Sequence, residues 1–170
     1  MGRPPAESLS FYDDLRAAYR SLPSRDITII CGDFNAKLGQ KTPQDSFMGQ
    51  WCRGIRNRNG HLLANLCDEL RLVAFNTLFR KRATNLTTWS QTRTTHRIFN
   101  QIDFILGPHN QRRFCTNAQS WGGLITPSDH KLVTADINLA VATKRRHHRQ
   151  RVAHVKPDYH LLADPETRLV

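Results

Sequence analysis

The segment Gly32-Asp33-Phe34-Asn35 places a carboxylate and an amide two residues apart, directly after an apolar run. If that run is a strand, Asp33 and Asn35 leave it in roughly the same direction, because alternate residues share a face. A carboxylate can take a proton from water or bind a hard cation, and an amide can donate a hydrogen bond to a phosphate oxygen. The same residues are also typical of an Asx turn that closes a strand. On its own, this segment indicates either a phosphate site or a turn.

A second candidate is the pair Asp129-His130, which follows Ser128 and precedes an apolar stretch. At the start of a strand, the carboxylate can face a metal ion while the imidazole faces a phosphate. A capped turn explains the same three residues and is the commoner origin of such a sequence. The pair is therefore a weak signal when it is taken alone.

A third candidate is Asp103, which lies in the otherwise apolar stretch Gln101–Ile105. Burying a carboxylate within a strand costs free energy unless the group has a partner. A histidine is an obvious partner, because a carboxylate that orients an imidazole also raises its basicity. The alternative is that Asp103 occupies a solvent-facing position of the strand.

The surrounding sequence predicts the helices that must support these groups. Apolar residues three or four apart predict a helix over residues 6–21 whose buried side is Leu9, Tyr12, Leu15 and Tyr19. A second helix is predicted over about residues 60–70, with Asn59 as its N-cap.

Runs of apolar and β-branched residues predict strands at 27–31, 72–75, 87–89, 101–106, 113–119 and 131–139. The first of these, Ile27–Cys31, is expected to be buried on both faces. Strands alternate with helices early in the chain and then follow one another. This order predicts an α/β (α+β) fold with helices on one side of a sheet.

The order and spacing of these segments resemble the endonuclease/exonuclease/phosphatase family over about residues 11–139. In detail the chain is similar to the endonuclease region of non-LTR retrotransposons and to craniofacial development protein 2-like proteins. The residues that carry this resemblance are Gly32–Gly39, Asn59-Gly60, Asn76–Phe79, Asn100–Asp103 and Ser128–His130. The resemblance implies the C-terminal half of a four-layer α/β/β/α sandwich, with a mostly antiparallel or mixed sheet and flanking helices.

The resemblance also implies Mg²⁺-assisted hydrolysis of a phosphodiester, with Mn²⁺ as an alternative ion. By their positions in the motifs, Asp33 would activate or hold the attacking water and Asn35 would contact the scissile phosphate. His130 would stabilise charge that develops on the phosphate, with Asp103 orienting it, and Asp129 would help to hold the metal.

Only the later half of the family's domain has a counterpart in this chain, so the resemblance assigns no residue here to the metal-binding Glu of the earlier half. Because Mg²⁺ prefers several hard oxygen ligands, we expect weakened metal binding and little or no activity from this chain alone. A sheet face that the absent half would cover is expected to favour self-association.

The composition favours a polyanionic partner, because the formal net charge is +11 and the pI is about 10.3. Five of the positive charges lie in the run Lys144–Arg151, and Arg80-Lys81-Arg82 forms a second basic segment. We expect Arg80, Lys81 and Arg82 to bind nucleic acid, with DNA as the favoured form. A non-catalytic basic module that binds nucleic acid or another partner is the alternative function.

Residues 1–140 are predicted to form the partial family domain, and residues 141–170 a poorly ordered basic linker and tail. No apolar run approaches the roughly 18 residues of a membrane span, so no membrane partner is expected. The first residues lack the pattern of a signal peptide. The four cysteines form no CxxC pair. We therefore expect reduced thiols and an intracellular, nuclear or cytoplasmic protein that is not secreted.

Overall fold

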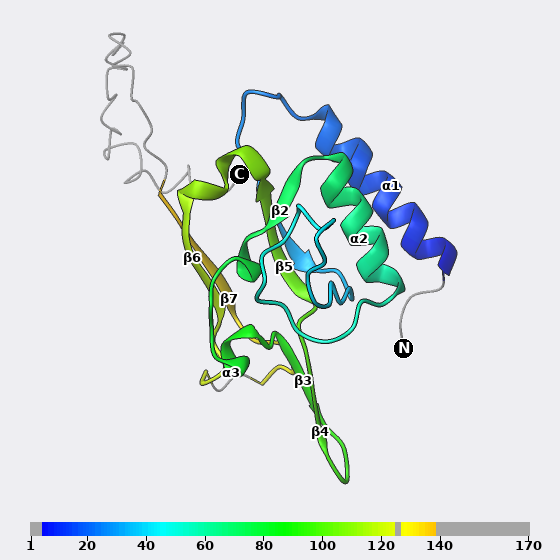
Figure 1. Cartoon of the computed structure of the whole chain (residues 1–170). Helices are drawn as coiled ribbons and strands as arrows, with labels where there is room; N and C mark the ends of the chain where they lie inside the picture. The colour runs from blue at the N-terminus through cyan, green and yellow to red at the C-terminus, as the bar shows by residue number, and fades with distance from the viewer. Residues whose placement is uncertain (1–4, 125–126, 139–170) are drawn as a thin grey trace, which may run out of the picture. The chain divides into compact units, whose positions relative to one another are not determined.

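The computed structural model describes residues 5–124 and 127–138 (Figure 1). The tail predicted at residues 141–170 lies outside the described residues. The helical elements are α1 (Pro5–Ser21), α2 (Arg58–Glu69), α3 (Ala83–Leu86) and the 3₁₀ turns η1 (Phe75–Thr77) and η2 (His109–Phe114). In the described part of the chain, no helix combines the length and the apolar character that crossing a membrane requires.

The strands are all paired antiparallel. They are β1 (Ile30–Asp33), β2 (Leu72–Ala74), β3 (Trp89–Thr92), β4 (Arg97–Asn100), β5 (Asp103–Pro108), β6 (Cys115–Ser120) and β7 (Val133–Ile137). Within the described residues they form three sheets with the orders β1-β5-β2, β3-β4 and β6-β7. This mixture of helices and antiparallel sheet confirms the predicted fold class.

The central strand β5 is covered by apolar residues on both faces. Phe104 and Leu106 are fully buried against α1 and α2, which lie side by side on this face of the sheet (Figure 1). Ile105 points the other way and joins a second cluster of buried residues, which consists of Val73, Phe75, Cys115 and Ala118. This two-sided burial explains why the sequence of β5 is almost continuously apolar.

The prediction of a first strand buried on both faces was wrong. The strand starts later, at Ile30, and pairs only with β5 among the described residues, so it lies at an edge of the sheet. Ile27 and Cys31 are exposed. A short β-branched run predicts a strand correctly, but it does not reveal how many neighbours the strand has.

Two details of the predicted helices also change. Leu9 is 48% exposed, and Ser8 takes the buried position on α1 together with Tyr12. The N-cap of α2 is Asn57 rather than Asn59, and its side chain accepts a hydrogen bond from the backbone of Gly60. The first change shifts the buried face of α1 by one residue, and the second starts α2 two residues earlier than predicted.

Leu106 tests the packing of the central strand, because none of its surface is exposed. We expect Leu106→Ala to lower the free energy of unfolding by about 2–5 kcal/mol, because it removes buried methyl groups and leaves a cavity. Urea denaturation measures this change. The exposed Leu22 provides the control, and Leu22→Ala should change the same quantity by less than about 0.5 kcal/mol. Equal effects of the two substitutions would contradict the described core.

Candidate active site

Two carboxylates meet where β1 ends and β5 begins. The antiparallel register pairs Asp33 with Asp103, and the pairing continues through Ile30 and Leu106 at the other end of β1. Directly opposite residues of two neighbouring strands project from the same face of the sheet. The backbone pairing therefore brings together two of the residues that the sequence singles out.

The imidazole of His130 lies between these two carboxylates. Its Nδ1 is 3.1 Å from Oδ1 and 3.2 Å from Oδ2 of Asp103. Its Nε2 is 3.9 Å from Oδ2 of Asp33. A backbone bridge between His130 and Trp89 fixes the position of the histidine along the edge of β3. Because Asp103 occupies Nδ1, Nε2 is the ring nitrogen that faces Asp33 and the more exposed side of the site.

Burial raises the pKa of the Asp103 carboxyl above its ordinary range, and the nearby charge of Asp33 acts in the same direction. A hydrogen bond from Thr88 and the proximity of His130 oppose this rise. Thr88 Oγ1 also accepts hydrogen bonds from the backbone N–H groups of Ile102 and Asp103, at 3.0 and 3.1 Å. Asp103 is thus held through both its side chain and its backbone.

Asn76 also supports β5, through hydrogen bonds to the backbone of Asp103 and Ile105. Its Nδ2 donates to the Asp103 carbonyl at 3.0 Å, and its Oδ1 accepts from the Ile105 N–H at 3.3 Å. Asn76 and Thr88 are both buried. Sequence reasoning assigned neither of them a place in the site, although Asn76 and the Thr87-Thr88-Trp89 segment stood out in the sequence. A polar residue at a strand end is ordinarily interpreted as part of a turn. Only the burial of Asn76 and Thr88 in the structure reveals that they support β5.

Asn35 forms a tight turn with Asp33. Its backbone N–H donates to Asp33 Oδ1 at 2.9 Å, its Nδ2 lies 3.4 Å from Asp33 Oδ2, and its φ angle is +47°. The segment is therefore an Asx turn, and the same turn places both side chains at the candidate site. A hollow of about 290 Å³ adjoins it and is lined by Ser8, Phe11, Tyr12, Asp33, Phe34, Asn35 and Asn59.

Asp129 directly precedes His130 and has hydrogen-bond partners of its own. Its carboxylate accepts a hydrogen bond from the indole N–H of Trp89 at 2.7 Å, and its carbonyl accepts one from Ser90 at 2.9 Å. A hollow of about 270 Å³ adjoins this segment and is lined by Ser90, Arg97, Gly122, Gly123, Leu124, Ser128, Asp129, His130 and Lys131.

The family resemblance implies a metal ion, but the described side chains do not build a metal site by themselves. Within residues 5–124 and 127–138, no group of three or more His, Cys, Asp or Glu residues could hold an ion. Mg²⁺ prefers several hard oxygen ligands in a near-octahedral arrangement, and the Asp33 carboxylate alone does not meet that demand. The metal-binding function of Asp129 remains a prediction.

The basic segment predicted to bind nucleic acid lies on the connection between η1 and α3, and its first two residues have local partners. The guanidinium of Arg80 is 5.6 Å from the centre of the Trp51 ring. Lys81 Nζ donates to Asn117 Oδ1 at 2.6 Å. Arg82 is exposed and precedes α3. The hydrogen bonds and ion pairs around Asp33 and His130 do not include these three residues.

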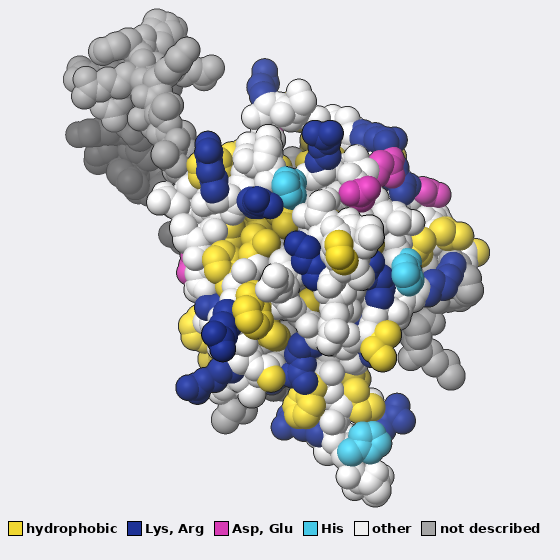
Figure 2. All heavy atoms as spheres, in the orientation of Figure 1, with side chains coloured by type: hydrophobic (Ala, Val, Ile, Leu, Met, Phe, Trp, Pro, Cys, Tyr) yellow, Lys and Arg dark blue, Asp and Glu magenta, His cyan; other side chains and the backbone are white. Residues whose placement is uncertain are grey.

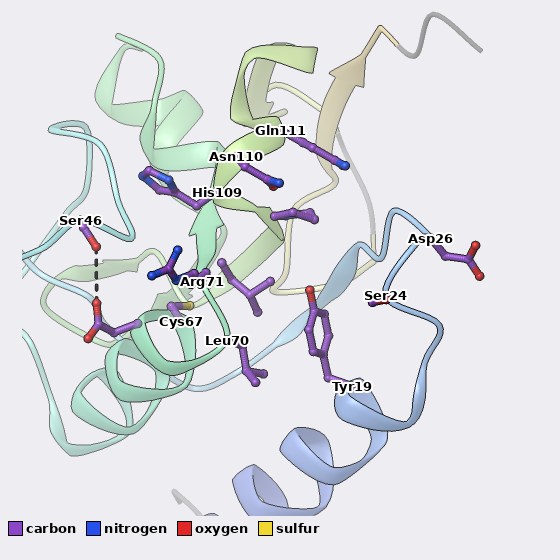
Figure 3. A pocket seen from close by; sticks show the side chains of 13 residues that line it. Tyr19, Ser24, Asp26, Ser46, Cys67, Leu70, Arg71, His109, Asn110 and Gln111 are labelled. Atoms are coloured by element: carbon purple, nitrogen blue, oxygen red, sulfur yellow. Dashed lines mark hydrogen bonds between the residues drawn. The ribbon is translucent and has the colours of Figure 1, made fainter. Parts of the chain in front are cut away.

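A larger cavity, of about 650 Å³, lies at the opposite end of β5 (Figure 3). Tyr19, Arg71 and Gln111 line it together with Pro108, the last residue of the strand, whereas Asp103 is the first. None of the residues that the sequence predicts for the active site lines this cavity. It is therefore separate from the Asp33–His130–Asp103 cluster.

Residues 2–130 match the sequence pattern of the Endonuclease/Exonuclease/phosphatase family. The chain belongs to this family. It is 36% identical over 134 residues to craniofacial development protein 2 from Tragulus javanicus, an overlap of 78% of this chain and 23% of that protein. The same protein from Bos taurus is 35% identical over 134 residues, which are 78% of this chain and 22% of that protein. The chain thus spans about a quarter of the length of these relatives.

Two solved structures share the fold of this chain. The endonuclease domain of TRAS1, a telomere-specific non-LTR retrotransposon, superposes with a TM-score of 0.59 at 17% identity, over 82% of this chain and 55% of that domain. The 3'-5' exonuclease NExo from Neisseria meningitidis gives a TM-score of 0.52 at 20% identity, over 78% of this chain and 52% of that enzyme. These similarities confirm the resemblance that the motifs indicated.

Thr88 tests the support beneath Asp103. We expect Thr88→Val to lower the free energy of unfolding by about 2–3 kcal/mol, because two buried backbone N–H groups lose their acceptor. Thr88→Ser keeps the hydroxyl and should retain most of that stability. Urea denaturation of the two variants measures the difference, and equal losses would show that the hydroxyl does not support β5.

The raised pKa of Asp103 predicts a pH dependence. The folded protein holds this proton more tightly than the unfolded chain, whose reference pKa is 3.8. The contribution of Asp103 to stability therefore falls as the pH rises above 3.8. Asp103→Asn removes this titration, so its stability relative to the native chain should increase between about pH 4 and pH 7. Urea denaturation at both pH values tests this, and a difference that decreases over the same interval would contradict it.

Proposed function

We propose that this chain carries the phosphate-facing side of a phosphodiesterase site that acts on nucleic acid. The observation that carries the proposal is the imidazole of His130, which lies between the carboxylates of Asp33 and Asp103. Hydrolysis of a phosphodiester needs a positioned water and stabilisation of the charge that develops on the phosphoryl oxygens. Asp33 can meet the first demand, and the imidazole that Asp103 orients can meet the second.

Each residue has a distinct proposed function. Asp33 is partly exposed, so its carboxylate can hold or deprotonate the attacking water. In its imidazolium form, His130 donates from Nε2 to a phosphoryl oxygen while its Nδ1–H donates to the Asp103 carboxylate, which orients the ring. Asn35 adds a neutral donor to the scissile phosphate from the same turn as Asp33.

A divalent ion, Mg²⁺ or Mn²⁺, would supply further charge stabilisation in such a reaction. Because the described side chains offer no group of three ligands, we propose that a productive metal site also needs ligands from elsewhere. Asp129 and Asp33 would then be partial contributors. On this basis, we propose that the chain alone is weakly active or inactive.

A nucleic-acid partner is supported by charge. Figure 2 shows Lys and Arg side chains spread over the displayed face, whereas Asp and Glu gather mainly near one edge. Arg97 and Lys131 line the hollow beside His130, where phosphates flanking the scissile bond would lie. We propose DNA as the substrate. The basic segment Arg80–Arg82 would then extend the contact with the phosphate backbone.

The alternative is a basic module that binds nucleic acid without cleaving it. The specific observation in its favour is the absence of a metal-binding cluster among the described side chains. Such a module would bind through backbone phosphates, so its affinity would fall steeply with salt and would not depend on Mg²⁺.

A nicking assay on supercoiled plasmid separates these functions. We expect any cleavage to require Mg²⁺ and to fall by about 100-fold in Asp33→Asn and in His130→Ala, because each loses a group that acts on the transition state. Asp26→Asn is the matched control, because Asp26 lines the distant cavity.

Cleavage that persists in Asp33→Asn, or that proceeds without a divalent ion, would contradict the proposed site. Salt-sensitive binding that does not depend on Mg²⁺ and is unchanged in Asp33→Asn and His130→Ala would favour the binding module instead.

A further inference from the structure

The cavity at the far end of β5 has no part in the proposed function. Its volume of about 650 Å³ falls within the range of pockets that hold small organic molecules. Its walls include the end of α1, the loop before β1, the end of α2 with the residues that follow it, and the start of η2. A hollow that segments so far apart in the sequence build together is a feature of the folded chain and not of one loop.

The inner wall of this cavity is largely apolar. Leu72 and Cys67 are fully buried, and Leu70 is partly buried. Figure 3 shows the Tyr19 phenol extending from α1 into the cavity. Burial raises the pKa of the Cys67 thiol to about 12, so this sulfur stays protonated near neutral pH and is not a nucleophile. The wall can therefore hold the apolar body of a ligand without reacting with it.

Arg71 brings a cation to the same cavity (Figure 3). Its φ angle is +51°, a left-handed conformation that is unfavourable for a residue other than glycine. Two backbone hydrogen bonds hold it, one from the Arg71 N–H to the Asp68 carbonyl at 3.3 Å and one from the His109 N–H to the Arg71 carbonyl at 2.8 Å. Within residues 5–124 and 127–138, no ion pair or hydrogen bond engages the Arg71 guanidinium. All of its donors are therefore available to an anionic ligand.

His109 lies next to Arg71 and adds a directed donor. Its Nε2 is 3.1 Å from a guanidinium nitrogen of Arg112. Because a guanidinium only donates, Nε2 accepts, and the proton of the neutral imidazole lies on Nδ1. This end of the cavity therefore combines two positive charges with a ring N–H, which is a favourable environment for a phosphate.

The other polar groups of the cavity are acceptors. Gln111 lines it, and in the described part of the chain the buried Oε1 of Gln111 has no hydrogen-bond partner. An unsatisfied buried acceptor costs free energy, which a donor would recover. The Asp68 carboxylate lies 3.4 Å from Ser46 Oγ, and that of Asp26 lies 3.8 Å from Arg25 Nε. A ligand that fits the cavity thus carries hydrogen-bond donors as well as an anionic group.

We propose that this cavity binds a nucleoside monophosphate. The phosphate contacts Arg71 and His109, the base packs against Tyr19 and Leu70, and the base or the ribose donates to Gln111. A bare phosphate leaves the apolar wall and the acceptors unused, and a fatty acyl chain leaves the acceptors unsatisfied. The inference goes beyond the proposed function, because no residue of the candidate active site lines the cavity.

An NMR titration of the isotope-labelled full chain with each of the four nucleoside monophosphates tests the proposal. We expect the amide signals of Arg71, His109 and Gln111 to shift together and to saturate with at least one nucleotide. Inorganic phosphate should bind at least about tenfold more weakly, because it buries no apolar surface.

Arg71→Gly is the most informative variant, because glycine suits the φ angle of +51° and the fold is kept while the guanidinium is lost. We expect it to weaken nucleotide binding by about 30-fold, through the loss of charge-assisted hydrogen bonds. Arg93→Gly is the matched control, because it removes the same charge from the exposed turn between β3 and β4. Its affinity should stay within about twofold of the native value, because salt screens an exposed distant charge.

Gln111→Leu should change stability and affinity in opposite directions. It removes the unsatisfied buried oxygen, so the midpoint of urea denaturation should rise. It also removes the acceptor for the ligand, so nucleotide binding should weaken by about fivefold. A loss of affinity together with a loss of stability would show that Gln111 only supports the fold, and would contradict its proposed contact with the ligand.

Saturable shifts at Asp33 and His130, with none at Arg71 and His109, would place the nucleotide in the candidate active site. That result would overturn the cavity proposal while supporting the proposed function. The absence of shifts with all four nucleotides, equal affinity for inorganic phosphate, or unchanged affinity in Arg71→Gly would also overturn the cavity proposal. None of these last three results bears on the proposed function.

Discussion

The antiparallel register of β1 and β5 is the constraint on which the candidate site depends. It places Asp33 directly opposite Asp103, an arrangement that repulsion between like charges disfavours. A shift of β1 by one residue would separate the carboxylates, but it would also turn Ile30 away from the core cluster that contains Phe104 and Leu106. The hydrophobic core thus enforces an electrostatically costly pairing, and His130 offsets part of the cost.

His130 reaches this position through backbone contacts with β3. The N–H of Ser90 donates to the Asp129 carbonyl, and the N–H of Lys131 donates to the Thr88 carbonyl. The residues on either side of the histidine are therefore held by Ser90 of β3 and by Thr88, the residue just before β3, whose hydroxyl also supports Asp103. One short segment positions the imidazole and its carboxylate partner together, so the two cannot move independently.

Much of the candidate site could be predicted from the sequence, because the chemistry of a residue follows from its type. The cost of burying Asp103 predicted a histidine partner, and the structure pairs it with His130. The turn and the site appeared as alternatives for Gly32–Asn35, yet the Asx turn is itself what orients both side chains. An Asx turn is formed by residues that are near neighbours in the sequence, which is why the sequence offers it as one of the two alternatives.

Other features depend on neighbours that lie far away in the sequence. The exposure of β1 follows from its position at the sheet edge, and an apolar run does not encode that position. The supporting functions of Thr88 and Asn76 arise from hydrogen bonds to Asp103 of β5 across 15 and 27 residues.

The most direct measurement of the central claim is an NMR titration of the isotope-labelled full chain with a short DNA duplex. If the register of β1 and β5 builds a phosphate-facing site, the amide signals of Asp33, Asn35, Asp103 and His130 should shift together. Signals of Arg71 and His109, which line the cavity at the other end of β5, should stay unchanged. Shifts confined to that distant end, with the four site residues unaffected, would contradict the account.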